Sequence, residues 1–160
     1  MRARLVIGLF GLALPVALAV ACRAPTQARV DIVTTAPCAE LTGVALTVKS
    51  RPVAAEQAVA GRFVTATTRE CASGRVGDIV LAPGEDTGAI VVVAGYKGVP
   101  ATDCVPPAYA NCIVARRSFS FIEHTTLTIP ISLDPDCVNV PCDALSTCSK
   151  GKCVDATVRC

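Results

Sequence analysis

Cysteine is the residue type whose number and spacing in this chain could do chemistry. The chain has ten cysteines, and five of them fall within residues 134–160: Cys137, Cys142, Cys148, Cys153 and Cys160. Zinc sites and thioredoxin-type redox sites usually rely on C-x2-C pairs, which bring two thiolates close together. No such pair occurs in the sequence, and this tail holds no histidine. In an exported chain we therefore expect disulfides here, with no metal and no cofactor.

The N-terminus predicts export. Two arginines precede the uncharged run 5–21, which ends in small residues just before Cys22. A basic start, an apolar run and small residues at its end are typical of a bacterial signal peptide, here residues 1–21. The alternative is a transmembrane anchor. It fits less well because the run is at the short end of the spanning range and Pro15 interrupts it.

Cys22 follows a segment that resembles the lipobox of bacterial lipoproteins. The four residues before it read LAVA, with alanine where the lipobox usually has leucine. The resemblance implies that Cys22 is acylated and that residues 22–28 form a lipidated tether, anchored by more than the two hydrophobic signals that stable attachment needs. Ordinary signal peptidase could cut at the same place without attaching lipid. We expect lipidation, and a location at the outer membrane or the periplasmic face of a bacterial cell envelope.

The charge of the chain argues against nucleic acid as a partner. The full sequence has 15 basic and 13 acidic side chains, but Arg2 and Arg4 belong to the signal peptide. The remaining chain is therefore balanced in charge. It offers no basic stripe that could neutralise phosphates.

The segment 29–134 has the pattern of an all-β domain. Seven short strand-like runs, some of them with alternating apolar residues, are separated by glycine and proline, which indicates an antiparallel β-sandwich of the immunoglobulin or transthyretin type. Residues 52–61 could form a helix or a long loop, and Pro130 places the last strand at a sheet edge or at a bulge. The predicted strands are 29–35, 42–50, 61–70, 76–82, 89–96, 113–121 and 125–133.

The tail, residues 135–160, resembles the opening of an EGF-like module. The spacing C-x4-C-x5-C runs from Cys137 through Cys142 to Cys148. In EGF modules the first cysteine pairs with the third and the second with the fourth. The resemblance therefore implies the pairs Cys137–Cys148 and Cys142–Cys153. The later EGF cysteines and the usual calcium-binding signature are absent, so the resemblance covers the first part of the tail alone.

The cysteines of the predicted sandwich suggest two more bonds. Cys104 and Cys112 flank the proline-rich loop 105–111, which a disulfide could close. Cys38 and Cys71 then form the remaining pair.

The state of Cys160 depends on the state of Cys22. If Cys22 carries lipid, nine cysteines remain and at least one of them cannot pair within the chain. Cys160, the last residue and outside the EGF-like quartet, is then the candidate for a free or intermolecular thiol. If Cys22 is not acylated, the ten cysteines can form five bonds.

The sequence gives little support to catalysis, and we expect no enzyme. The single histidine, His124, lies in a predicted turn between two strands, where it is a poor candidate for a general base. Glu85 and Asp86 lie in a predicted hairpin connection, and Arg116 and Arg117 point to opposite faces of a predicted strand. No G-x-S-x-G elbow, H-E-x-x-H helix or phosphate-binding glycine loop occurs.

Over most of its length the chain resembles cell-envelope lipoproteins of the myxobacterial type. The shared features are the Cys22 lipobox, the motif APC at 36–38, the runs IVLAPGEDTGAIVVVAGYKG and CIVARRSFSFIEHTTLTIPISL, and the cysteine-rich tail. The resemblance implies location and architecture but no activity. We therefore expect a non-catalytic, lipid-anchored binding or scaffold protein that contacts the membrane through Cys22 and an envelope protein partner. The alternative is a structural subunit of a surface or secretion assembly.

Overall fold

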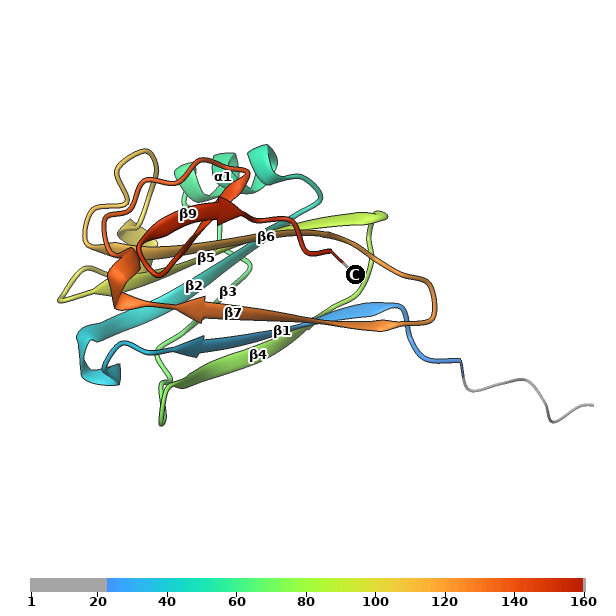
Figure 1. Cartoon of the computed structure of the whole chain (residues 1–160), viewed down its shortest axis with the longest axis horizontal. Helices are drawn as coiled ribbons and strands as arrows, with labels where there is room; N and C mark the ends of the chain where they lie inside the picture. The colour runs from blue at the N-terminus through green and yellow to red at the C-terminus, as the bar shows by residue number, and fades with distance from the viewer. Residues whose placement is uncertain (1–22, 160) are drawn as a thin grey trace, which may run out of the picture.

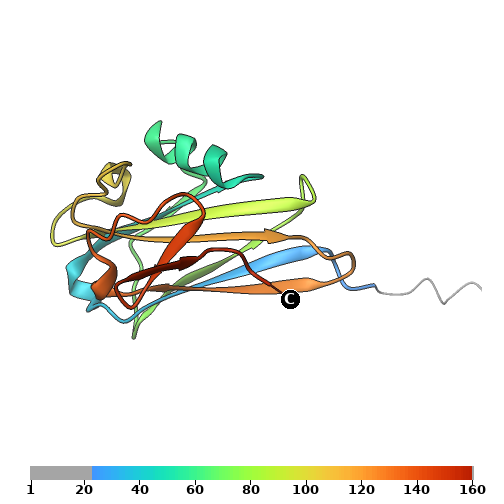
Figure 2. The same ribbon diagram turned by 45° about the horizontal axis from the view of Figure 1, so that its top comes forward.

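The computed structural model describes residues 23–159 (Figure 1). The predicted signal peptide 1–21, the lipidation site Cys22 and the terminal Cys160 lie outside the described residues. The described chain is built mainly of β-strands, which confirms the all-β class predicted from the sequence. Two sheets pack face to face, and one helix covers the outer face of the larger sheet (Figure 2).

The first sheet has three strands in the order β4-β1-β7. They span Arg75–Leu81 (β4), Gln27–Thr34 (β1) and Thr126–Leu133 (β7). β1 pairs antiparallel with β4 but parallel with β7, so the expectation of a wholly antiparallel sandwich is wrong at this pair. Parallel neighbours need a long crossover, and here the strands of the second sheet intervene along the chain. β7 lies at a sheet edge, as Pro130 predicts.

The second sheet has four strands in the order β3-β2-β5-β6. They span Ala66–Thr68 (β3), Leu41–Lys49 (β2), Thr87–Tyr96 (β5) and Cys112–Ser120 (β6). β5 is buried from Gly88 through Gly95. A strand covered on both faces reads as a continuous apolar run, which is why this segment does not alternate in the sequence.

The burial of β5 reflects two apolar cores. The inner core lies between the sheets, where Val92 of β5 joins Ile129 of β7 in one cluster. The outer core lies under helix α1 (Pro52–Ala60), where Val91 of β5 joins Val59 of the helix. Each fully buried aliphatic side chain of this kind stabilises the fold by roughly 1.5–3 kcal/mol. Both faces of the four-stranded sheet are therefore held by apolar packing.

Residues 52–61, for which the sequence left helix and loop open, form α1. Pro52 occupies the first turn, where its missing N–H leaves no hydrogen bond unmade. Gly61 ends the helix, and its N–H donates to the carbonyl of Gln57 at 3.0 Å. A Cβ at Gly61 would lie 2.8 Å from the ring of Phe63, so glycine suits this close approach.

The predicted strand 61–70 is wrong over most of its length, because only Ala66–Thr68 form β3. The preceding residues bring the chain back from α1 to the sheet, and the N–H of Thr65 donates to the carbonyl of Leu46 at 2.8 Å. Phe63, which lies in the predicted strand, is 70% exposed. The hydroxyl of Thr65 also accepts from the N–H of Val48 at 3.0 Å, so this segment stays bonded to β2 beyond the end of β3. Short 3-10 helices connect other elements: Cys38–Glu40 (η1), Ala101–Asp103 (η2) and Pro135–Cys137 (η3).

The cysteine-rich tail docks along the edge of β6. The backbone of Ser118 bonds it twice: its N–H donates to the carbonyl of Ala156 at 3.0 Å, and its carbonyl accepts from the N–H of Val158 at 2.8 Å. The N–H of Arg116 donates to the hydroxyl of Thr147 at 3.0 Å. The tail thus continues the hydrogen bonding of the larger sheet. It folds into a hairpin of two strands, Ser146–Ser149 (β8) and Lys152–Asp155 (β9).

Four disulfides hold the described chain together, and they join the four pairs named from the sequence. The two bonds of the tail join its first cysteine to its third and its second to its fourth. Cys137, Cys142 and Cys148 belong to the inner core. Disulfides persist in oxidising compartments, which places the protein in an extracytoplasmic environment. Within residues 23–159, no helix has the length and apolar character needed to cross a membrane. The bonds are Cys38–Cys71, Cys104–Cys112, Cys137–Cys148 and Cys142–Cys153.

One buried ion pair connects α1, a loop and β6. Arg116 is 3% exposed, and its Nε lies 2.6 Å from Oε1 of Glu56 on α1. The hydroxyl of Tyr109 donates to the other oxygen of Glu56 at 2.6 Å, and the Arg116 guanidinium lies 5.3 Å from the centre of the Tyr109 ring. Burial, and then the hydrogen bond to Glu56, raise the pKa of Tyr109 above its ordinary value, so it stays a neutral donor. The guanidinium of Arg116 therefore links α1 and the loop of Tyr109 to β6.

We expect Glu56→Gln to lower the free energy of unfolding by about 3 kcal/mol, because it leaves the buried Arg116 charge without its counter-ion. The matched control is Asp103→Asn, which breaks the exposed pair between Arg62 and Asp103 and should cost less than about 1 kcal/mol. Urea unfolding measures both variants. Equal losses in the two variants would contradict the role given to the buried pair.

Candidate functional site

The two long sides of the sandwich differ in how they are closed. On the side of β6 and β7, the tail hairpin covers the edge of the larger sheet (Figure 1). On the opposite side the edge strands are β3 and β4, and no described segment lies across them. This open side holds a groove with an apolar floor, and it is the candidate site.

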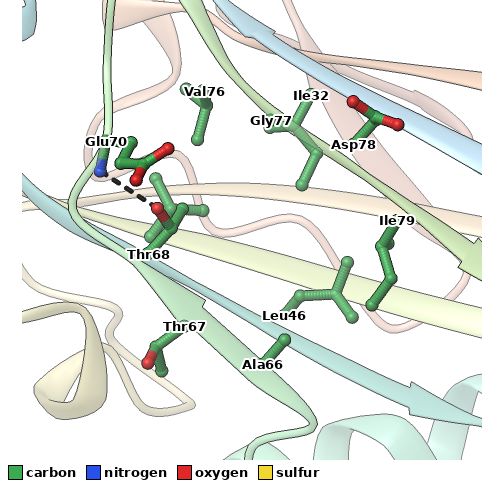
Figure 3. Close-up of a pocket in the computed structure, with 11 residues that line it drawn as sticks. Ile32, Leu46, Ala66, Thr67, Thr68, Glu70, Val76, Gly77, Asp78 and Ile79 are labelled. Carbon is green, nitrogen blue, oxygen red and sulfur yellow. Dashed lines mark hydrogen bonds between the residues drawn. The ribbon is translucent and has the colours of Figure 1, made fainter.

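A groove of about 370 Å³ opens between β3 and β4 (Figure 3). Its floor reaches the inner core, because Leu46 of β2 and Ile79 of β4 point toward each other across it, with Ile32 and Val76 beside them. Ile32 and Val76 are buried, whereas Ile79 is half-buried. The groove lies between the edge strands of the two sheets, with β3 on one side and β4 on the other.

A second hollow, of about 500 Å³, continues along the same side and shares Ile79 with the first. Phe119 and Phe121 contribute to its wall, with their ring centres 5.1 Å apart in an edge-to-face arrangement. Glycine is needed at position 88, because a Cβ there would lie 2.4 Å from the ring of Phe119. The open side is therefore hollowed along much of the length of the sandwich.

The rim of the two hollows is more acidic than basic. Asp78 is neutralised by Arg75 at 2.8 Å and by Arg29 at 3.4 Å. Among the described residues, the rim carboxylates Glu70 and Glu85 take part in no ion pair. The N–H of Glu70 donates to the hydroxyl of Thr68 at 3.0 Å, which fixes the chain where it leaves β3 (Figure 3).

The edge of β4 supplies a second kind of binding group. β4 pairs with β1 along one edge only, from Arg75 to Leu81. In the described part of the chain, the backbone groups of Val76–Leu81 that point away from β1 make no other hydrogen bond. A row of free N–H and C=O groups thus lies beside an apolar groove.

The residues considered for chemistry in the sequence do not meet at this groove. His124 lies in the turn before β7, where its ring Nε2 is 3.1 Å from a guanidinium nitrogen of Arg23. Glu85 and Asp86 occupy the connection between β4 and β5, as predicted. Arg116 is committed to the buried ion pair with Glu56.

The two tyrosines are also occupied by carboxylates. Tyr96 bonds Glu40, and this contact raises the pKa of the Tyr96 hydroxyl; Tyr109 bonds Glu56. Neither ring lines the groove. Within residues 23–159, no three histidine, cysteine, aspartate or glutamate side chains form a cluster that could hold a metal ion.

Sequence reasoning missed the groove residues because their types are ordinary for strands. Leu46, Ile79 and Thr68 lie in predicted strands, and apolar alternation does not show which strands form the facing edges of two sheets. The one available signal was the polar run from Thr67 to Glu70, which lacks the apolar alternation of the other strands.

The comparisons with known proteins add no family: no protein-family model matches the chain, and neither the curated proteins nor the solved structures contain a match. The chemistry of the groove must therefore be argued from its own residues. An apolar floor, a free strand edge and a carboxylate rim suit binding.

Proposed function

We propose that this protein is a non-catalytic, lipid-anchored protein of the bacterial cell envelope that binds a partner through the open side of its sandwich. The observation that carries the proposal is the groove between β3 and β4, which joins an apolar floor to an unpaired strand edge. Pockets that bind ligands are mostly apolar with a few placed polar groups. The partner is another envelope component, and nucleic acid is not expected because the chain has no basic stripe.

The position of the tether supports this arrangement. Residues 23–26 leave the sandwich at the end that holds the turns 82–86 and 121–125 (Figure 1). The backbone N–H of His124 donates to the hydroxyl of Thr26 at 2.9 Å, which holds the tether against this end. A lipid on Cys22 would place this end toward the membrane. The groove, which runs along a side, would stay accessible.

A second function has its own support. The unpaired edge of β4 favours the alternative of a structural subunit in a surface or secretion assembly, because free strand edges readily pair with another chain. Stoichiometric co-purification with a partner distinguishes the subunit from a free-standing binder. We also propose that the tail is EGF-like and that the sandwich is of the immunoglobulin or transthyretin type.

The anchor is tested by the intact mass of membrane-extracted protein, alkylated without reduction. We expect a chain that begins at an acylated Cys22 and carries one alkylated thiol, assigned to Cys160. Cys22→Ser should move the protein to the soluble fraction, because it removes the attachment point of the lipid. A wholly soluble wild-type protein with unmodified Cys22 would refute the anchor.

The binding surface is tested in cells with a photo-crosslinking residue at Ala66, which lines the groove. The matched control carries the same residue at Thr128, an exposed position of β7. We expect a discrete adduct from Ala66 and none from Thr128. The proposal fails if Ala66 gives no adduct, or if both positions give the same one.

A further inference from the structure

We propose that the open side takes up one extended segment of a partner protein, which adds as a strand to the free edge of β4 and fills the groove with its inward side chains. This inference rests on the proposed function and names the class of its ligand. Strand addition is a common mode of peptide recognition, in which main-chain hydrogen bonds bind the segment and pockets select its alternate side chains.

In the described part of the chain, β4 is the one long strand edge that has neither a proline nor a cover. Proteins protect edge strands by shortness, proline, charge or a cover. In this structure β3 is three residues long, β7 contains Pro130, and the tail covers β6. β4 extends over seven residues with neither proline nor lysine, and its two charged residues, Arg75 and Asp78, pair with each other. An edge of this kind is a template for another chain.

The molecule already shows, on its opposite side, how an extended segment covers a strand edge. On the opposite side, the chain near Ala156 and Val158 bonds the backbone of Ser118, and the side chain of Ala156 is 2% exposed. Backbone bonds and an inward apolar side chain thus act together. A segment beside β4 would find the same two features, free backbone groups and an apolar floor.

The groove also determines which side chains the partner segment can carry. Successive residues of a strand point to opposite faces, so every second side chain of the segment would enter the groove. The floor there is formed by Leu46, Val76 and Ile79, and the volume of about 370 Å³ suits small and medium apolar side chains. The segment is therefore apolar at alternate positions over the length of β4.

Carboxylates on the rim of the groove favour a partner segment with basic ends. Glu70 lies toward one end, and Glu85 lies in the turn that follows β4 at the other. Neither is in an ion pair among the described residues, and Lys49 is the one lysine on the rim. Lysine or arginine at the two ends of the segment would meet unpaired carboxylates, which favours association with a basic-flanked partner.

A second copy of this chain is a poorer occupant. The inward side chains of the second β4, Ile79 and Leu81, are packed against the core of their own molecule. They could not fill the groove. The occupant is therefore a segment of a different protein.

The test measures the binding of a synthetic peptide to the purified mature chain by fluorescence anisotropy. The probe is a labelled peptide of about nine residues that alternates valine and threonine between lysine flanks, matched to the length of an ordinary strand. A second peptide replaces the central valine and its neighbour by proline, and a third has glutamate flanks. We expect the lysine-flanked probe to bind, the proline peptide to fail, and the glutamate peptide to bind about tenfold more weakly at low salt.

The protein variants are matched on one strand. Ile79→Lys puts a charge into the groove, and Val80→Lys puts the same charge on the outer face, where Val80 is 52% exposed and borders the second hollow but not the groove. We expect about a tenfold loss of affinity for Ile79→Lys and less than about a twofold change for Val80→Lys, because a charge in the apolar groove has no partner. The peptide series decides the result even if Ile79→Lys fails to fold.

Equal binding of the proline peptide, or no binding of the lysine-flanked probe at about 1 mM, the weak end of measurable affinity, would overturn strand addition. Loss of binding with Val80→Lys equal to that with Ile79→Lys would overturn the groove as its location. Failure here remains distinct from failure of the proposed function. A crosslink from Ala66 in cells would still support a partner at the open side, bound in another way.

Discussion

The constraint on which this structure depends is that backbone groups at strand edges must find partners or be protected. Two small sheets leave four edges, those of β3, β4, β6 and β7. The chain satisfies β6 with its own tail, limits β3 to three residues, and places a proline in β7. Among the strands of residues 23–159, β4 alone keeps a long outer edge without a cover or a proline. The position of the groove, the role of the tail and the proposed function all follow from this asymmetry.

The tail can serve as a cover because cross-links and one polar cluster hold it in place. A segment of this length cannot bury a useful core of its own. Two disulfides fix its shape, and Cys137 and Cys148 bury their side chains in the inner core of the sandwich. Thr147 accepts from the backbone of Arg116, whose side chain is bound to Glu56 on α1. One arginine therefore connects the helix, the sheet and the tail.

Much of the fold could be predicted from local sequence patterns, and the candidate site could not. Apolar alternation located most strands, Pro52 and Gly61 indicated the helix, and cysteine spacing together with the EGF resemblance named the disulfides. The parallel pairing of β1 with β7 depends on long-range topology, which alternation does not encode. The groove depends on which strands lie at the facing edges of the two sheets, β3 and β4, and that order is also a matter of long-range topology. The buried pairing of Arg116 with Glu56 joins residues sixty positions apart, so local sequence patterns could not predict it.

The account as a whole predicts a sandwich closed on one side by its own chain and open on the other to a partner. Amide hydrogen exchange of the mature protein, followed residue by residue, tests this most directly, because exchange reports which backbone N–H groups are bonded. The outward amides of Arg116 and Ser118 should exchange slowly under the tail, whereas the outward amides of Val76–Leu81 should exchange at rates close to those of an unprotected peptide. Slow exchange along all of β4, or fast exchange at Arg116 and Ser118, would contradict the account.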